Sequence, residues 1–211
     1  MNKIAVIDYG MGNLHSVMKA LQYEKVAAIL TDKPETIRKC SGIILPGVGA
    51  FPDAMAEIKK RKLLEVLTGE VEGGKPILGI CLGMQLLFSC SSEFGTHKGL
   101  GFIPGKVVRF DRKMKVPHMG WNSAETAKKG SKILKSIKNG QYFYFVHSYY
   151  CVPSDKKAVL TKTQYGNTIF TSAVELGNVF GFQFHPEKSS EKAMVVYKNF
   201  FEICNGRTAE H

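Results

Sequence analysis

The first half of the chain alternates short, unbroken apolar runs with segments in which apolar residues recur at helical spacing. The apolar runs predict buried β-strands at 3–8, 27–31, 41–47 and 75–80. The helical spacing predicts helices at 14–24, 51–67 and 81–89. Strands that lack polar alternation and are joined by helices indicate a parallel sheet that is covered on both faces.

The second half of the chain is mostly strand. Strand-forming runs lie at 99–110, 141–150, 157–163, 167–176 and 178–187. Turns are expected at Gly105, Gly140, Gly166 and Gly177. A last helix is expected at 189–204, with Ser189 or Ser190 as its N-cap. The pattern over residues 1–211 therefore predicts one α/β domain, with a mostly parallel central sheet, helices on both faces and additional antiparallel strands.

The composition is that of an ordinary globular protein, since 44% of the 211 residues are hydrophobic and 22% are charged. No apolar run reaches the length of about 18 residues that a membrane span needs. The N-terminus lacks the long apolar segment of a signal peptide, so a cytoplasmic location is expected. The five cysteines are irregularly spaced and include no CxxC pair, which argues against a zinc site and a disulfide framework.

The net charge of +11 is concentrated in one segment. Residues 106–138, called the basic segment below, hold ten Lys or Arg and two acidic residues, a net charge of +8. Such a segment is compatible with a solvated surface, an anionic ligand or an acidic protein partner. Few aromatic residues are interleaved with its lysines and no nucleic-acid-binding motif is present, so nucleic acid is not an expected ligand.

Cys81 is the candidate nucleophile. It stands at the centre of Gly79-Ile80-Cys81-Leu82-Gly83, the spacing of a nucleophile elbow, in which a strand ends, the nucleophile takes a strained conformation and a helix begins. The strand and the helix predicted on either side supply the context that an elbow needs. The helix N-terminus would favour the thiolate and offer N–H groups to an oxyanion. A buried structural cysteine is the competing interpretation.

His185 and Glu187 are the candidate base and its orienting group. His185 follows a strand-like run, and Pro186 keeps it out of helical conformation. Residues i and i+2 of an extended chain point the same way, so the Glu187 carboxylate can hold the His185 imidazole as in a catalytic triad. A surface His–Glu pair is the competing interpretation. His147, which ends another apolar strand, is the second candidate base.

The loop 45–51, LPGVGAF, is the candidate oxyanion loop. It follows a predicted strand and precedes a predicted helix, and its two glycines permit backbone angles that expose N–H groups. Phosphate binding is a competing use of such a loop, but the P-loop lysine is missing. Gly10-Met11-Gly12 lacks the third glycine of a dinucleotide fingerprint, because His15 stands there.

These segments together resemble the triad-type class I glutamine amidotransferases over nearly the whole chain, through GICLGMQ, FHPE and a glycine loop after an earlier strand. Within that family the resemblance is greatest to the glutaminase subunits of imidazole glycerol phosphate synthases. The segments that carry it are DYGMGNL at 8–14, LPGVGAF at 45–51, GLGFIPG at 99–105, VPHMGWN at 116–122, FVHSYY at 145–150 and FHPEKS at 184–189. PGVG is the discriminating segment, because most members of the family carry Pro-Gly-Gly there.

The resemblance implies a reaction and a set of residues. Cys81 would attack the side-chain amide of glutamine, His185 would pass the proton to the leaving ammonia, and Glu187 would orient His185. The implied oxyanion and substrate contacts are Val48, Gly49, Leu82, Gln85, Ser148 and Tyr149. The implied partner is a (β/α)8-barrel synthase (cyclase) subunit, which would form a heterodimer, receive the ammonia and make imidazole glycerol phosphate in histidine biosynthesis. The implied interface residues are Asn13, Trp121 and Lys188. No cofactor, metal, nucleic acid or membrane is implied.

Two alternatives stay open on the sequence alone. The first is a paralogous glutaminase subunit that feeds ammonia to a synthase amidating surface sugars, because the basic segment surrounds the implied docking motif and no glycine follows soon after FHPEKS. The second is a catalytically inactive module of the same fold, against which the intact Cys81, His185 and Glu187 set argues.

Overall fold

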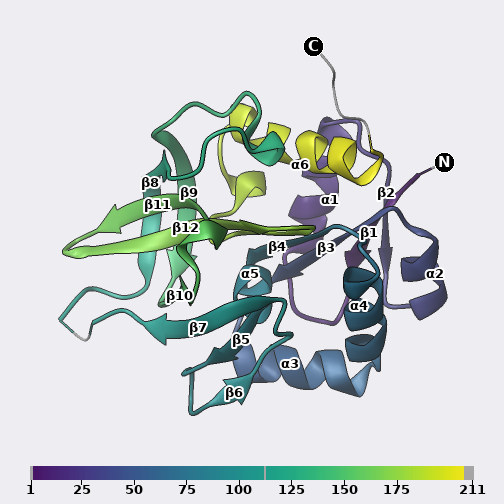
Figure 1. The fold of residues 1–211 in the computed structure, drawn as a ribbon, viewed down its shortest axis with the longest axis horizontal. Helices are drawn as coiled ribbons and strands as arrows, with labels where there is room; N and C mark the ends of the chain where they lie inside the picture. The colour runs from purple at the N-terminus through teal and green to yellow at the C-terminus, as the bar shows by residue number, and fades with distance from the viewer. Residues whose placement is uncertain (1, 112, 207–211) are drawn as a thin grey trace.

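Parallel strands form the centre of the molecule in the computed structural model, which describes residues 2–111 and 113–206 (Figure 1). The parallel strands lie side by side in the order β2-β1-β3-β4-β13. Their bounds are Ile4–Ile7 for β1, Ala28–Thr31 for β2, Gly42–Gly47 for β3, Ile77–Cys81 for β4 and Val179–Phe182 for β13. Every residue of β1, β3, β4 and β13 is buried, as expected for parallel strands covered on both faces.

Beyond β13 the sheet continues through mainly antiparallel pairs in the order β12-β10-β7-β5-β6. The bounds are Thr168–Leu176 for β12, Tyr149–Pro153 for β10, Ile103–Arg109 for β7, Phe88–Ser91 for β5 and His97–Lys98 for β6. A branch of three strands leaves this path, because β11 pairs with β12 and β8, and β8 pairs with β9. Its bounds are Val159–Tyr165 for β11, His118–Thr126 for β8 and Gln141–His147 for β9.

Helices cover both faces of the parallel strands (Figure 1). On one face lie α1 (Leu14–Tyr23) and α6 (Glu191–Cys204), whose apolar residues join one core cluster. On the other face lie α2 (Pro34–Lys39), α3 (Phe51–Lys60) and α4 (Leu63–Glu72), whose residues join a second cluster. The short helix α5 (Leu82–Leu86) follows β4, and 3-10 turns lie at Lys132–Leu134, Lys156–Ala158 and Pro186–Lys188. This arrangement confirms the predicted fold class.

Some predicted elements were wrong in detail. The helix predicted at 51–67 is two helices, because Lys62 takes a left-handed conformation with φ of 57° between them. The helix predicted at 81–89 ends at Leu86, and β5 begins two residues later. The turn predicted at Gly105 is not a turn, since Gly105 lies inside β7. There its φ is 145°, and a Cβ would stand 2.5 Å from a carbonyl oxygen of the neighbouring strand β10.

The sequence did not predict strand β8, and its pattern explains why. His118 and Ala124 of this strand face inward and are buried, whereas Met119 and Trp121 face outward and are 62% and 54% exposed. The usual alternation of apolar residues inside and polar residues outside is therefore inverted over much of β8. The polar imidazole of His118 is buried, and the apolar side chains of Met119 and Trp121 are exposed. Reading strands from apolar periodicity alone misses such a segment. Helix α2 was missed as well, because six residues are too few to show a period.

The carboxyl ends of three neighbouring parallel strands meet at one edge of the sheet. In the register of the sheet Gly47 lies beside Cys81, and Phe182 lies beside Ile80. The loop after β3, the elbow after β4 and the segment after β13 therefore converge, as is usual for ligand sites in parallel α/β sheets. Among residues 2–111 and 113–206, no helix has the length and apolar character needed to cross a membrane.

Candidate active site

Cys81 sits on a sharp turn between a strand and a helix. It is the last residue of β4, its backbone has φ of 55° and ψ of −110°, and α5 begins at Leu82. A positive φ is costly for a residue with a side chain and is held here by close packing on both sides. A Cβ on Gly83 would stand 1.8 Å from the carbonyl oxygen of Leu45, and a Cβ on Gly79 would stand 2.6 Å from the Gly83 backbone. The two glycines of the predicted elbow are therefore sterically required.

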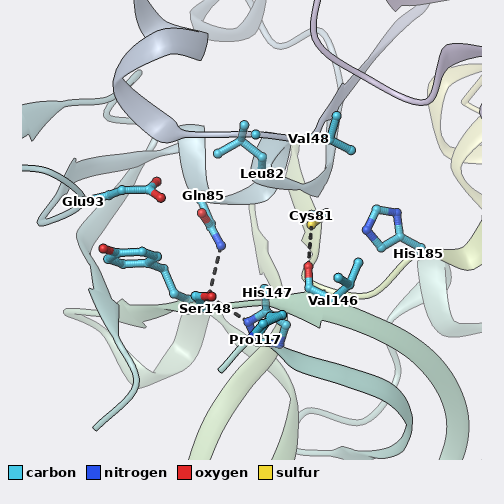
Figure 2. Close-up of a pocket in the computed structure, with 12 residues that line it drawn as sticks. Val48, Cys81, Leu82, Gln85, Glu93, Pro117, Val146, His147, Ser148 and His185 are labelled. Carbon is cyan, nitrogen blue, oxygen red and sulfur yellow. Dashed lines mark hydrogen bonds between the residues drawn. The ribbon is translucent and has the colours of Figure 1, made fainter. Parts of the chain in front are cut away.

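His185 is turned toward Cys81 (Figure 2). Its backbone N–H donates to the carbonyl oxygen of Tyr144 in β9, 2.9 Å away, which fixes the residue beyond the end of β13. Its Nδ1 lies 2.7 Å from Oε1 of Glu187, and both side chains are buried. Nε2 has no hydrogen-bond partner among the described residues and is the nitrogen left for Cys81 and a substrate. The structure thus brings the predicted nucleophile, base and orienting group together.

Tyr197 of α6 completes the surroundings of Glu187. Its hydroxyl donates to Oε2 of Glu187 at 2.9 Å, so each carboxylate oxygen has a donor. Burial by itself would lower the pKa of His185, but the charge of the ionised Cys81 and the Glu187 carboxylate outweigh it and raise the pKa to about 10. The site therefore favours an imidazolium whenever a negative charge stands on the sulfur.

His147 is not placed as a base, because both of its ring nitrogens are engaged. Nδ1 lies 2.7 Å from the carbonyl oxygen of Tyr149, which can only accept, so Nδ1 carries the proton. Nε2 then accepts from Nδ1 of His118 at 3.2 Å, and Nε2 of His118 accepts from Asn122 at 3.3 Å. Burial lowers the pKa of His147 to about 3 and that of His118 to about 4. The pair stays neutral and acts as a fixed hydrogen-bonded unit.

A cavity of about 350 Å³ opens over Cys81. Its walls include nine of the residues named from the sequence, namely Val48, Gly49, Cys81, Leu82, Gln85, His147, Ser148, Tyr149 and His185. Gln85 Nε2 and His147 Nδ1 both donate to the carbonyl oxygen of Tyr149, at 3.1 and 2.7 Å, and both side chains are drawn in Figure 2. Gly49 has φ of 98°, a conformation that favours glycine, and Val48 beside it is 40% exposed. The cavity has the size, and the few convergent polar groups, of a site for a small polar molecule.

Three site residues had not been found from the sequence. Glu93 lines the cavity, and its carboxylate accepts the N–H of Phe51 at 2.8 Å. Burial raises its pKa and the Phe51 N–H works against that rise. No motif marks Glu93 or Tyr197. Gln183 stands two residues before His185 in an extended run, so the i, i+2 rule could have placed it on the side of the base.

The three residues named as a partner interface lie away from this cavity. Trp121 is more than half exposed on β8 and its ring packs edge-on to Tyr144 of β9. Lys188 is exposed in the turn after His185. Asn13 caps α1, since its Oδ1 accepts the N–H of Ser16 at 3.4 Å. Within the described residues, no three His, Cys, Asp or Glu side chains gather as a metal ion would require.

Comparison with known proteins shows the family to which the chain belongs. A family model described as glutamine amidotransferase class-I matches residues 5–204. The imidazole glycerol phosphate synthase subunit HisH of Moorella thermoacetica is 49% identical over 203 residues, which cover 96% of each chain. The protein of the same name from Aquifex aeolicus is 48% identical over 199 residues, covering 94% of this chain and 95% of the relative.

Solved structures share the fold at low sequence identity. A crystal structure of a glutamine amidotransferase superposes with a TM-score of 0.75 at 18% identity, covering 96% of this chain and 98% of the other. The PurLQS structure from Thermotoga maritima gives a TM-score of 0.75 at 19% identity, with the same coverage. Since the family model spans nearly the whole chain and the relatives are almost half identical to it, the chain belongs to the class I glutamine amidotransferase family of enzymes.

Proposed function

We propose that residues 1–211 act as one glutaminase domain that hydrolyses glutamine to glutamate and ammonia, with Cys81, His185 and Glu187 as its catalytic triad. The observation that carries the proposal is the 2.7 Å contact between His185 Nδ1 and Glu187 Oε1, because His185 lines the same cavity as Cys81. A nucleophile, a base and a group that orients the base are what covalent acyl transfer needs.

The reaction takes two steps. The Cys81 sulfur attacks the side-chain amide carbon of glutamine, and its proton passes through Nε2 of His185 to the amide nitrogen. The C–N bond breaks, ammonia leaves and a glutamyl thioester remains. His185 then takes a proton from a water molecule whose oxygen attacks the thioester carbon, the C–S bond breaks, glutamate leaves and the proton returns to the sulfur. Glu187 keeps the other proton on Nδ1, so that Nε2 is the nitrogen that exchanges protons.

Backbone groups at the two strand ends would stabilise the tetrahedral oxyanion. The N–H of Leu82 lies at the start of α5, and the Val48-Gly49 peptide lines the same cavity. Donors preorganised around developing negative charge are usually a large contribution to acyl transfer. The positive φ of Gly49 lets this peptide turn its N–H toward the cavity at little cost.

The far end of the cavity suits the amino-acid part of glutamine. The Glu93 carboxylate offers an acceptor for the α-ammonium group. Both hydrogens of Gln85 Nε2 are directed at protein acceptors, the carbonyl oxygen of Tyr149 and Oε1 of Gln183, each 3.1 Å away. Oε1 is therefore the Gln85 atom left for the substrate, next to the Ser148 and Tyr149 backbone.

We also propose that the chain is the glutaminase subunit of an imidazole glycerol phosphate synthase and passes its ammonia to a (β/α)8-barrel partner in histidine biosynthesis. Relatives of that name at 43–49% identity support this partner over a sugar-amidating one. The face that fits a partner is the outer side of β8 and β9, where Met119, Trp121 and Tyr142 are each more than half exposed. We call these residues the apolar ribbon face. Asn13 and Lys188 are proposed to flank the same interface.

The apolar ribbon face is connected to the triad by the backbone. Trp121 pairs with Tyr144 across the ribbon, and Tyr144 in turn accepts the N–H of His185. The strand that carries Tyr144 continues through Val146 into the cavity wall. A partner seated on this face would therefore press on the strand that positions both His185 and the cavity.

Cys81→Ala tests the catalytic proposal. We expect it to abolish release of ammonia from glutamine in the assembled enzyme, while synthesis from added ammonium salt persists because the partner is untouched. Cys90→Ala is the matched control, since Cys90 is partly exposed on β5 and does not line the cavity. Full glutamine-dependent activity in Cys81→Ala would refute the proposed triad.

Trp121→Ala tests the partner proposal. We expect its affinity for the barrel subunit to fall at least about tenfold, because large aromatic residues dominate interface energies. Ile169→Ala is the control, since Ile169 is also exposed (66%) but lies on β12, outside the apolar ribbon face. Titration of each variant with the barrel subunit measures the difference, and equal affinities would place the interface elsewhere.

A further inference from the structure

Gln183 is a buried amide beside the nucleophile that the steps above do not use. Its side chain is fully buried between the end of β13 and His185 and does not line the cavity. Its Nε2 lies 3.8 Å from the Cys81 sulfur, and its Oε1 lies 3.1 Å from Nε2 of Gln85. A buried amide needs hydrogen-bond partners for both its nitrogen and its oxygen, and here the partner of the nitrogen is the Cys81 sulfur, the proposed reacting atom.

The orientation of this amide follows from a backbone group. The carbonyl oxygen of Tyr149 can only accept, so the side-chain atom of Gln85 that faces it is the nitrogen. The second hydrogen of that nitrogen is directed at Gln183, so the Gln183 atom facing Gln85 is the oxygen. The Gln183 nitrogen is then left facing the Cys81 sulfur, with an N–H to donate.

The neutral pair of His118 and His147 fixes the first hydrogen bond of this series, the one from Gln85 to Tyr149. The carbonyl oxygen of Tyr149 also accepts from His147 Nδ1, which His118 and Asn122 hold in one tautomer. The Tyr149 carbonyl oxygen, which has two lone pairs, thus accepts from two donors. Rotation of the Gln85 or Gln183 amide would place two acceptors or two donors against each other in a buried site, which is costly.

We propose that Gln183 is a further catalytic contact of the glutaminase site: its N–H donates to the Cys81 sulfur and stabilises the thiolate that attacks glutamine. The inference rests on the proposed function, in which Cys81 is the nucleophile. A hydrogen bond to a charged acceptor in a buried site is stronger than one to a neutral acceptor. The contact therefore favours the thiolate over the thiol and over the thioester, and it links the ionised nucleophile to the substrate-facing residue Gln85.

Alkylation of the isolated full chain by iodoacetamide across pH 5–10 reads this contact directly. The thiolate is the reactive form, and peptide mass spectrometry assigns the rate to each cysteine. In Gln183→Met, which keeps the length but has no N–H, we expect the midpoint of the Cys81 profile to rise by about one to two pH units. The rate at pH 7 should fall at least about tenfold. The profile of Cys90, partly exposed in the same molecule, should not move.

Ser172→Ala is the matched structural control. Ser172 lies in β12 next to Gln183, because the backbone N–H of Gln183 donates to the Ser172 carbonyl oxygen. The substitution removes a buried hydrogen bond of 2.8 Å between the side chains of Ser172 and Thr161. It should leave the Cys81 profile unchanged. If Gln183→Met fails to fold, Gln183→Asn keeps the amide but withdraws it by one methylene, and the same rise of the midpoint is expected.

An unshifted Cys81 profile in a folded Gln183 variant would overturn the proposal, and so would an equal shift in Ser172→Ala. The alkylation uses neither glutamine nor the partner. Activity in Cys81→Ala would refute the triad, whereas an unshifted profile refutes only the role of Gln183, so the two failures are distinguishable.

Discussion

Phenylalanine substitutions at two fully buried tyrosines, Tyr197 and Tyr9, should have different effects on the free energy of unfolding: only the first should lower it. The Tyr197 hydroxyl donates to Oε2 of Glu187 at 2.9 Å, whereas the Tyr9 hydroxyl has no hydrogen-bond partner among the described residues. Each substitution removes one oxygen and leaves the ring packing in place. The pair therefore isolates what a buried hydroxyl contributes when it is paired and when it is not.

The magnitudes follow from the two environments. A hydrogen bond to a charged group contributes a net of about 1.5–3 kcal/mol, so Tyr197→Phe should lower the free energy of unfolding by about that amount. Tyr9→Phe removes an unpaired buried hydroxyl, so it should leave the free energy unchanged or raise it by up to about 1 kcal/mol. In a chain of this length each 1 kcal/mol corresponds to about 2–4 °C in Tm, so the melting temperatures of the two variants should be clearly separated.

Urea unfolding of the wild type and both variants at pH 7.5 measures the difference. Burial, together with the charge of Glu187, holds the pKa of Tyr197 well above its usual value. The Tyr197 hydroxyl therefore keeps its proton, and the separation should be the same at pH 6.5 and pH 8.5. Two variants within about 0.5 kcal/mol of each other would refute the reasoning, because both hydroxyls would then have equivalent surroundings; that margin is the usual size of a substitution without a specific mechanism.

Three further predictions concern pH, packing and salt. Because burial lowers the folded-state pKa of His118 to about 4 and of His147 to about 3, the unfolded chain takes up protons first as the pH falls. The contribution of these two histidines to stability should therefore be constant above pH 6.5. Below pH 6.5 stability should fall by up to about 1.4 kcal/mol per pH unit for each histidine, and a flat urea-midpoint profile between pH 6.5 and 4.5 would contradict this. Gly83→Ala should prevent correct folding, because its Cβ would stand 1.8 Å from a carbonyl oxygen of β3, whereas Gly69→Ala, with nothing within 4 Å, should raise Tm; circular dichroism melts of both would show the contrast. Affinity for the barrel subunit should fall as salt rises if the basic segment faces the partner, and salt-insensitive titrations would make that charge incidental.

The sequence alone determined features that depend on neighbouring residues in the chain. Gly79 and Gly83 around Cys81 predicted the elbow. The structure shows why both are glycines, since a Cβ at either position would overlap with backbone atoms. His185 and Glu187 were paired from the two-residue period of an extended chain, which is a local property. The apolar runs of the parallel strands predicted the fold class for the same reason, since burial on both faces leaves a mark within each strand.

Only the tertiary structure decided contacts between residues far apart in the chain. Gln183 meets Cys81 across 102 positions, and Gln85 meets Gln183 across 98, because β4 and β13 lie side by side in a fixed register. Glu93 enters the cavity from a segment without any motif, held by an N–H at the start of α3. A one-residue slip of β13 along β4 would turn the side chains of β13 to the other face of the sheet and would move Gln183 relative to Cys81. The register is set by the packing of the whole domain. Local sequence patterns therefore predicted the nucleophile and its base, whereas the tertiary structure determined which other groups contact them.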